Sequence, residues 1–414
     1  MERRPDHVPP KTTDVSTRAT DQRASRALIV SMLLTLGAPG AAEAQQNLEG
    51  VLSFLLTNRS IRTDDPTQDE QAASATRDTI SRFLSAELST LPTSSSASGF
   101  TYRLDPGLGG GVVRSSDSFG PFFVERSLTA GKWRPSVGVS YQDATFHAID
   151  GRNLRDGTLV ATASRLRGEA LPFDVETVAL FLRSHTVTFS GNLGVTDRLD
   201  VGVALPFVRL TLRGERVDAL RGVTFLQARA DASASGIGDI VIRAKYNVLR
   251  RGGSGLAVGA ESRLPTGAKE NLLGSGKTVL KPRVVASLEG TRVGVHGDLG
   301  YSFGGLSKQL DYGTAVTIAA NPRLTVVGEM LGQRFDTGGR LMETTAPHPR
   351  LIGVDTIRLS AVPEGTERVL AIGGVKWNLA ASMLLSATVL RPLTDAGLTP
   401  RWVPAVAIEY SFGG

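Results

Sequence analysis

The feature of this sequence that most constrains its fold is a two-residue alternation of apolar and polar side chains that recurs along most of the chain. From about Phe100 onward, segments of roughly nine or more residues carry this pattern, and turns or loops separate them. The segment from Asp239 to Val248 is typical, because its even-numbered positions are apolar and its odd-numbered positions are mostly polar. Successive side chains of a β-strand point to opposite faces, so the pattern predicts a chain built from strands.

Soluble β-sandwiches and transmembrane β-barrels share this alternation, and other features must separate them. The polar positions carry charges on neighbouring strands and many glycines, which suits a water-filled lumen. Aromatic residues tend to end the apolar rows, as in the interfacial girdles of membrane barrels. These aromatic residues are Tyr141, Phe207, Tyr246, Tyr301, Phe303 and Trp377.

The spacing of turns and loops also favours a membrane barrel. Short turns join the strands at one rim, and long loops are expected at the other, at about 148–176, 213–236, 265–277 and 335–353. We therefore expect residues 100–414 to form an all-β fold, a transmembrane antiparallel β-barrel of about 12–14 strands, preceded by a short helical segment. A soluble, secreted all-β protein is the alternative.

The start of the chain has the pattern of an export signal. Basic residues precede an uncharged apolar run at 27–37, and Ala42 and Ala44 fit the small-x-small pattern of a cleavage site. The run is too short to span a bilayer as a helix. Residues 1–44 are therefore expected to be a signal peptide, with cleavage before Gln45.

Residues 45–99 carry a helical periodicity instead. Apolar side chains recur at three- and four-residue spacing around 48–55 and again around 80–91, before Pro92 and a Ser-rich linker. Two interpretations remain open, an appendage that packs on itself or on the barrel and a plug or gate of the lumen. No stretch after the signal peptide is apolar for about 18 residues, so no transmembrane helix is expected there.

Charged side chains on the polar faces of neighbouring strands form the best candidate site. If these faces line a lumen, the side chains either make a constriction that selects solutes or form ion pairs that hold the wall or the N-terminal helices. The residues expected to line the pore are Asp239, Arg243, Lys245, Glu261, Arg263, Lys281, Arg283, His296 and Asp298.

Two short motifs suggest chemistry, but their contexts do not support it. Gly-Ser-Gly-Lys-Thr at 274–278 resembles the end of a phosphate-binding P-loop, yet the first glycine of that motif is missing and a strand follows. The letters G-x-S-x-G occur at 300–304, yet Ser302 lies inside an alternating strand rather than at a sharp turn before a helix. The histidines lack metal-ligand spacing and the chain has no cysteine, so no catalytic residue, metal or other cofactor is expected. The net charge of +6 is small and dispersed, so no nucleic-acid partner is expected.

Three spaced elements resemble a known family. They are LGVTDRLDVGVALPFVRL at 193–210, SGIGDIVIRAKYNV at 235–248 and SRLPTGAKENLLGSGKTVLKP at 262–282, and HGDLGYSFGG follows at 296–305. On these elements, residues from about 130 to 412 resemble the MetA-pathway of phenol degradation family. The resemblance implies an outer-membrane barrel that moves small hydrophobic or aromatic compounds, and it implies no catalytic residue.

The C-terminal strand leads to the functional expectation. Tyr410 and Phe412 end one face of this strand, as in the signal that the barrel-assembly machinery recognises, although two glycines follow. We expect a protein of the outer membrane of a Gram-negative bacterium, surrounded by its lipid, through which a small-molecule solute diffuses. A closed structural or interaction barrel is the alternative, and an enzyme is disfavoured.

Overall fold

The described part of the chain leaves out the predicted signal peptide. The structure is a computed structural model that describes residues 47–57, 67, 71, 74, 76, 78–80, 83, 99–105, 111–305, 307–336, 340–348, 350–362, 364–380 and 382–412. The predicted cleavage site, Ala42 and Ala44, lies outside the described residues. No helix among the described residues is long and apolar enough to cross a membrane.

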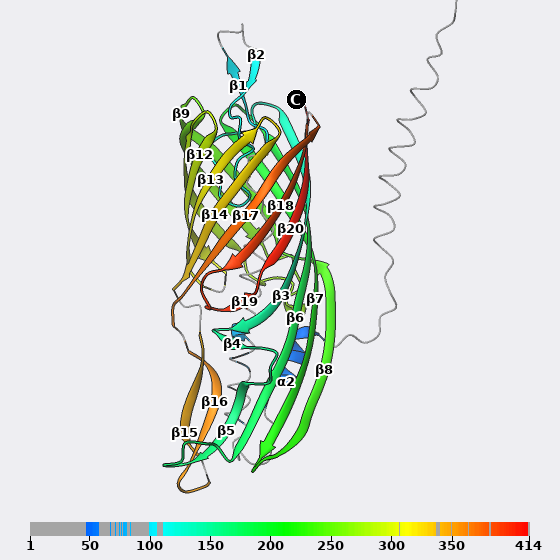
Figure 1. The fold of residues 1–414 in the computed structure, drawn as a ribbon, viewed down its shortest axis with the longest axis vertical. Helices are drawn as coiled ribbons and strands as arrows, with labels where there is room; N and C mark the ends of the chain where they lie inside the picture. Colours follow the sequence, from blue (N-terminus) through cyan, green and yellow to red (C-terminus); the bar gives the residue numbers. More distant parts are fainter. Residues whose placement is uncertain are drawn as a thin grey trace, which may run out of the picture. The chain divides into compact units, whose positions relative to one another are not determined.

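The main body is a closed, antiparallel ring of 12 strands (Figure 1). In ring order the strands are β3 (Arg134–Ile149), β6 (Asp174–Gly194), β7 (Leu199–Leu220), β9 (Ile240–Arg251), β10 (Ser254–Leu264), β11 (Val279–Glu289), β12 (Val293–Gly304), β13 (Gln309–Asn321), β14 (Leu324–Phe335), β17 (Thr366–Ala380), β18 (Met383–Pro392) and β20 (Val403–Ser411). β20 closes the ring on β3, with Tyr410 opposite Val137. The predicted antiparallel β-barrel is confirmed.

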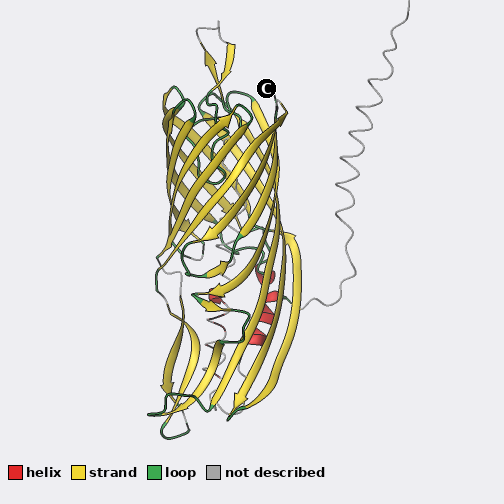
Figure 2. Cartoon of the chain, in the orientation of Figure 1, coloured by secondary structure: helices red, strands yellow, loops and turns green. Residues whose placement is uncertain are grey.

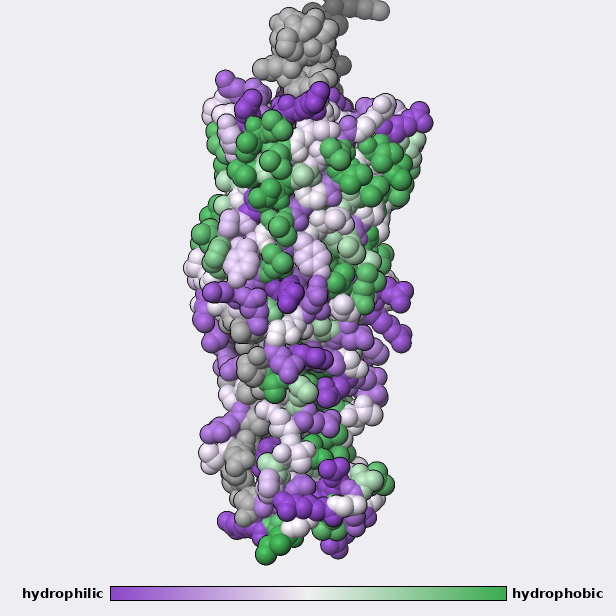
Figure 3. Space-filling view, turned by 90° about the vertical axis from the view of Figure 1, so that its left-hand side faces the viewer, coloured by the Kyte–Doolittle hydropathy of each residue, from purple (hydrophilic) through white to green (hydrophobic). Residues whose placement is uncertain are grey.

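The outer face of this ring is apolar, as the alternation predicts. Along β7 the outward side chains from Leu199 to Phe207 are apolar, and Val203 and Phe207 are 46% and 45% exposed. At about 3.3 Å per residue and a tilt of about 40°, this row covers a height of about 20 Å, comparable with the apolar band of membrane barrels. Figure 3 shows hydrophobic side chains gathered over the barrel and mostly hydrophilic ones beyond it.

Beyond this apolar belt the longest strands continue into a second region, which we call the lobe. Its pairing order is β15, β16, β5, β6, β7 and β8, and it lies at the rim opposite the short turns (Figure 2). The strands confined to it are β4 (Arg152–Asn153), β5 (Leu159–Leu166), β8 (Val223–Ile237), β15 (Arg340–Pro347), β16 (Val354–Val362) and β19 (Leu398–Pro400). Three of the four segments predicted as loops, 148–176, 213–236 and 335–353, therefore contain strands, and that part of the prediction is wrong.

The lobe exists because the apolar face of the strands reverses. After Phe207 the outward side chains of β7 include Arg209 and Arg213, whereas Leu210 and Leu212 on the opposite face are buried. The strand thus passes from a region with lipid outside to a region with water outside and an apolar core inside. The reversal explains why a fixed two-residue period does not extend through these segments.

Helix α2 (Leu48–Leu56) packs into the apolar core of the lobe. Asn47 caps its first turn by accepting a hydrogen bond from the Gly50 N–H at 2.7 Å. Leu48 and Leu55 are fully buried, in one cluster with side chains of β6, β7 and β8. The predicted helical character of this stretch is confirmed for α2, and the described positions from 67 to 83 are also helical.

Three small elements complete the described chain. β1 (Tyr102–Asp105) and β2 (Gly111–Arg114) form a separate two-stranded sheet. The 3-10 helix η2 (Lys269–Asn271) lies between β10 and β11. The predicted loop at 265–277 is thus confirmed, and the Gly-Ser-Gly-Lys-Thr motif belongs to a connection between two strands.

Candidate functional site

The lumen of the barrel is occupied by the irregular segment 115–133, which we call the lumen loop. It starts and ends at the short-turn rim, where the Trp133 N–H donates to the Gly194 carbonyl. Between these points its residues contact inward-facing side chains of β7, β9, β11, β12, β14 and β17. Phe119, Arg126 and Leu128 are fully buried. The lumen is therefore not an open passage in this conformation.

Glu125 is the charged centre of the lumen loop. Its carboxylate lies 3.4 Å from the Arg243 guanidinium, 3.5 Å from the Lys245 ammonium and 3.8 Å from the Arg283 guanidinium. Its main-chain N–H donates to the Asp298 carboxylate at 2.9 Å. A buried carboxylate is tolerated only when cations or donors surround it, and here the wall supplies both.

The aromatic part of the lumen loop is held by Glu329 and Lys376. The Glu329 carboxylate accepts hydrogen bonds from the N–H groups of Phe122, Phe123 and Val124, at 3.0 Å for Phe123 and 3.1 Å for Val124. The Lys376 ammonium donates to the Pro121 carbonyl at 2.6 Å and lies 5.1 Å from the centre of the Phe122 ring. Both wall residues are almost fully buried.

Residues 126–130 of the lumen loop, which lead back to the short-turn rim, are also held by wall side chains. The Lys245 ammonium donates to the Arg126 carbonyl at 2.9 Å, and the Asn247 amide donates to the Ser127 carbonyl at 2.7 Å. The Asp200 carboxylate accepts from the Ala130 N–H at 3.1 Å. Buried main-chain groups need partners, and wall side chains provide them here in place of a neighbouring strand.

Most of the predicted pore-lining charges form one network with the lumen loop. The Lys281 ammonium lies 3.4 Å from Glu261 and 3.8 Å from Asp311. The Arg283 guanidinium lies 3.4 Å from Glu261 and 3.6 Å from Asp298. With the Glu125 contacts, six of the nine predicted residues are joined by direct ion pairs or hydrogen bonds. These six are Arg243, Lys245, Glu261, Lys281, Arg283 and Asp298.

The three other predicted residues are Asp239, Arg263 and His296, and Arg263 interacts electrostatically with Glu261 of the network. Asp239 accepts from the Gly267 and Ser275 N–H groups at 3.1 and 2.8 Å, and so it fixes the connection between β10 and β11. Arg263, on β10, pairs in register with Val279 of β11. His296 is buried at the short-turn end, 3.0 Å from the Ser287 hydroxyl and 3.7 Å from Glu289.

Ser302, the serine of the G-x-S-x-G letters, contacts an acid and not a histidine in the structure. The Ser302 hydroxyl donates to Asp311 at 3.0 Å, and the His296 ring contacts Ser287 and Thr317 instead. Ser302 also lies within β12, without the strand-turn-helix context that an activated serine needs. These side chains thus make wall contacts, and the geometry gives no support for a nucleophile.

The residues that the sequence did not single out are those of the lumen loop. Its stretch from Ser116 to Thr129 contains two adjacent phenylalanines and a Glu-Arg pair between Gly, Pro and Ser residues, without a two-residue period. Glu329 and Lys376 could have been found from the alternation, because each lies on the inward-facing parity of its strand between outward-facing apolar residues. Their partners could not, since they lie about 200 or more residues away in sequence.

Several solved structures resemble this chain at low identity. The COG4313 outer membrane channel from Pseudomonas putida F1 is 14% identical, with a TM-score of 0.43, and the match covers 69% of this chain and 98% of that chain. The translocator domain of the autotransporter NalP from Neisseria meningitidis is 11% identical, with a TM-score of 0.35 and coverage of 68% and 88%. A Pseudomonas aeruginosa FadL homologue is 9% identical, with a TM-score of 0.33 and coverage of 78% and 98%. No curated protein matches the chain.

A family model matches residues 148–397, which is more than half of the chain. This range includes most of the lobe and the ring strands that carry Arg243, Glu261, Arg283 and Glu329. It agrees with the resemblance found in the sequence. The chain belongs to the MetA-pathway of phenol degradation family.

Proposed function

We propose that this protein is an outer-membrane channel for passive movement of small solutes, and that the lumen loop is its gate. One observation carries the proposal. The barrel encloses a polar lumen that the lumen loop occupies, and wall side chains, more than sheet pairing, hold this loop in place. The loop can therefore move without breaking the strand pairings that close the ring.

The energetics of the charges support a movable loop. Breaking a buried ion pair in a dry interior costs about 3–5 kcal/mol, because one charge is left uncompensated. In a lumen that opens to water, both partners are hydrated as they separate, and Lys245 and Arg283 keep other carboxylates nearby. The cost of displacing Glu125 is then closer to that of a solvent-exposed pair, about 1 kcal/mol or less.

The family description and the outer surface suggest the solute and the location. We propose that the solutes are small hydrophobic or aromatic compounds. The apolar belt would lie in the outer membrane of a Gram-negative bacterium, with the short-turn rim facing the periplasm. Export would use residues 1–44 as a cleaved signal peptide, and the barrel-assembly machinery would recognise the last strand, with Tyr410 and Phe412 on one face.

A closed structural barrel is a second candidate, and the extensive bonding of the lumen loop favours it. Glu125 contacts three cations of the wall, and Glu329 contacts three N–H groups of the loop. A barrel sealed in this way could serve only as a scaffold for the lobe.

Liposome swelling with the folded mature protein separates the two candidates. We expect swelling in a small sugar with the unaltered protein and faster swelling with Glu125→Ala, which removes the central anion of the gate. Glu215→Ala, which breaks an exposed ion pair with Arg229 in the lobe, is the matched control and should change nothing. If neither the unaltered protein nor Glu125→Ala admits solute, the channel proposal is refuted and the closed barrel is favoured.

A further inference from the structure

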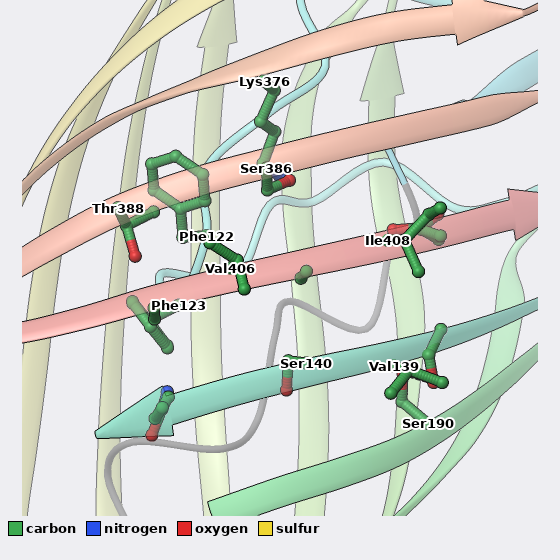
Figure 4. A pocket seen from close by; sticks show the side chains of 15 residues that line it. Phe122, Phe123, Val139, Ser140, Ser190, Lys376, Ser386, Thr388, Val406 and Ile408 are labelled. Carbon is green, nitrogen blue, oxygen red and sulfur yellow. Dashed lines mark hydrogen bonds between the residues drawn. The ribbon is translucent and has the colours of Figure 1, made fainter. Parts of the chain in front are cut away.

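A pocket lies between the lumen loop and the part of the wall where the ring closes (Figure 4). Phe122 and Phe123 line it from the loop, and residues of β3, β6, β17, β18 and β20 line it from the wall. Its volume is about 60 Å³. In Figure 4, Phe122 and Thr388 lie at one end of the pocket, and Val139, Ile408 and Ser190 lie at the other.

Small side chains form the central part of the wall of this pocket, between larger ones such as Gln142, Lys376 and Glu409. On β18, β20 and β3, Ser386, Ala407 and Ser140 stand side by side in register, and the neighbouring row contains Ala405. On the other side of the lumen, the inward-facing positions of β10 and β11 carry large charged side chains instead. These are Glu261, Lys281 and Arg283. The small side chains leave space opposite the two phenylalanine rings.

The ring of Phe122 is fixed by its contacts, whereas the ring of Phe123 is less constrained. Phe122 is buried, and its ring is contacted by the Lys376 ammonium at 5.1 Å. Phe123 is only partly buried, and its ring lies 6.4 Å from the Phe122 ring at 49°. A tilted pair of this kind presents ring faces and edges to a third aromatic ring, which is a favourable arrangement.

The pocket also contains a polar group that needs a partner. Thr388 is 7% exposed, and its hydroxyl has no hydrogen-bond partner among the described residues. Leaving a buried hydroxyl without a partner costs about 1–3 kcal/mol. A bound molecule that carries a hydroxyl group could remove this cost by exchanging a hydrogen bond with Thr388.

We infer that this pocket is a binding subsite for a small aromatic solute with one hydroxyl group, which stacks against Phe122 and Phe123 and hydrogen-bonds to Thr388. The inference deepens the proposed channel function, on which its biological purpose rests. In this conformation the pocket is smaller than the cavity of about 150 Å³ that accommodates benzene in an engineered protein interior. Binding therefore requires the Phe123 ring to turn away from its present position.

Equilibrium dialysis of the folded, detergent-solubilised protein against phenol, toluene and cyclohexanol tests the inference. Phenol should bind saturably and more tightly than either of the others, because toluene lacks the hydroxyl and cyclohexanol lacks the aromatic ring. Thr388→Val, which keeps the shape of the side chain, should weaken phenol binding about fivefold and leave toluene binding unchanged. Phe123→Ala should weaken both aromatic probes.

Thr356→Val is the matched control. Thr356 is also buried with an unpartnered hydroxyl among the described residues, but it lies on β16 in the lobe, away from the pocket. Heat-modified gel mobility verifies that each variant folds. Absence of saturable phenol binding, or an equal effect of Thr388→Val and Thr356→Val, would overturn the inference. Because dialysis in detergent needs no flux, its outcome is independent of the liposome test of the channel.

Discussion

The carboxylate of Glu125 lies 3.4 Å from the guanidinium of Arg243, so the lumen loop and the barrel wall are joined by an ion pair inside the lumen. Lys245, two residues further along the same strand, contacts the same carboxylate at 3.5 Å. The wall cations that the sequence suggested as pore-lining thus bind a part of the chain that occupies the pore. Under the proposed function, the same cations would line the path of the solute and hold the loop.

Reversing the charge of these two cations should both release the loop and alter the lumen. In Arg243→Glu with Lys245→Glu, Glu125 would face two carboxylates, and like charges at this distance repel. We expect larger single-channel conductance in planar bilayers and a shift of ion selectivity toward cations. Arg229→Glu, which reverses the charge of an exposed residue in the lobe, is the control and should change neither quantity. Unchanged conductance and selectivity in the double variant would reject the pore-lining role.

Close packing of α2 against β7 gives a second prediction. A Cβ atom added at Gly214 would lie 2.5 Å from Cδ1 of Leu55, so a larger side chain there must displace the side chain of Leu55 from its packed position. We expect Gly214→Val to destabilise the lobe by about 1–3 kcal/mol, as overpacking does. The measurement is hydrogen exchange of α2, which should speed up.

The control for this variant is Gly328→Val. Gly328 has nothing within 4 Å of an added Cβ and lies on β14, in the barrel. Its substitution should leave the exchange of α2 unchanged. Equal exchange in Gly214→Val and the unaltered protein would show that α2 does not depend on this contact.

The lobe should also respond to pH through Glu176. This residue lies at the lobe end of β6, outside the membrane-spanning part of that strand, and burial raises the pKa of its carboxyl to about 7. Because the pKa is raised above its ordinary value, the contribution to stability is complete below about pH 4.5 and is lost as the pH rises through 7. Hydrogen exchange of α2, corrected for the intrinsic rate, should therefore be faster at pH 8 than at pH 5.5.

Glu176→Gln is the variant that isolates this effect. The amide cannot ionise, so the pH dependence of exchange should disappear while the Arg216 contacts to the carbonyls of Phe54 and Leu55 remain. If the variant and the unaltered protein show the same pH dependence, another group in the lobe is responsible.

The strands of the ring could be predicted from the sequence, but the strands of the lobe could not. Strands such as β9 keep one mainly apolar and one mainly polar face over most of their length, because lipid lies on one side and a polar lumen on the other. On β7 the apolar face reverses between Phe207 and Leu210, because water replaces lipid outside. Sequence alternation does not reveal that exchange of surroundings, so the continuation of β7 beyond residue 212 falls in the predicted loop at 213–236.

The candidate site was predictable in part for a similar reason. Inward-facing charges such as Arg243 and Glu261 follow directly from the parity of their strands. The lumen loop has no period, and its position depends on side-chain contacts such as Glu329 to Phe123 that link distant parts of the chain. Such contacts are decided by the folded barrel and leave no local pattern in the sequence.

A reversible covalent lock on the tip of the lumen loop tests the central claim most directly. The chain has no cysteine, so an introduced pair is the only possible disulfide. A Cβ added at Gly313 on β13 would lie 3.0 Å from Cγ2 of Val124. In a disulfide a Cβ lies about 3 Å from the more distant sulfur, so Val124→Cys with Gly313→Cys is well placed to form one.

Single-channel recording of this double variant, before and after reduction, is the decisive measurement. If the loop is the gate, the oxidised protein should show almost no conductance, and a reductant should restore the conductance of the unaltered protein. Each single cysteine variant should be insensitive to the reductant. Equal conductance of the oxidised and reduced double variant would contradict the account, because solute would then pass while the loop is held in the lumen.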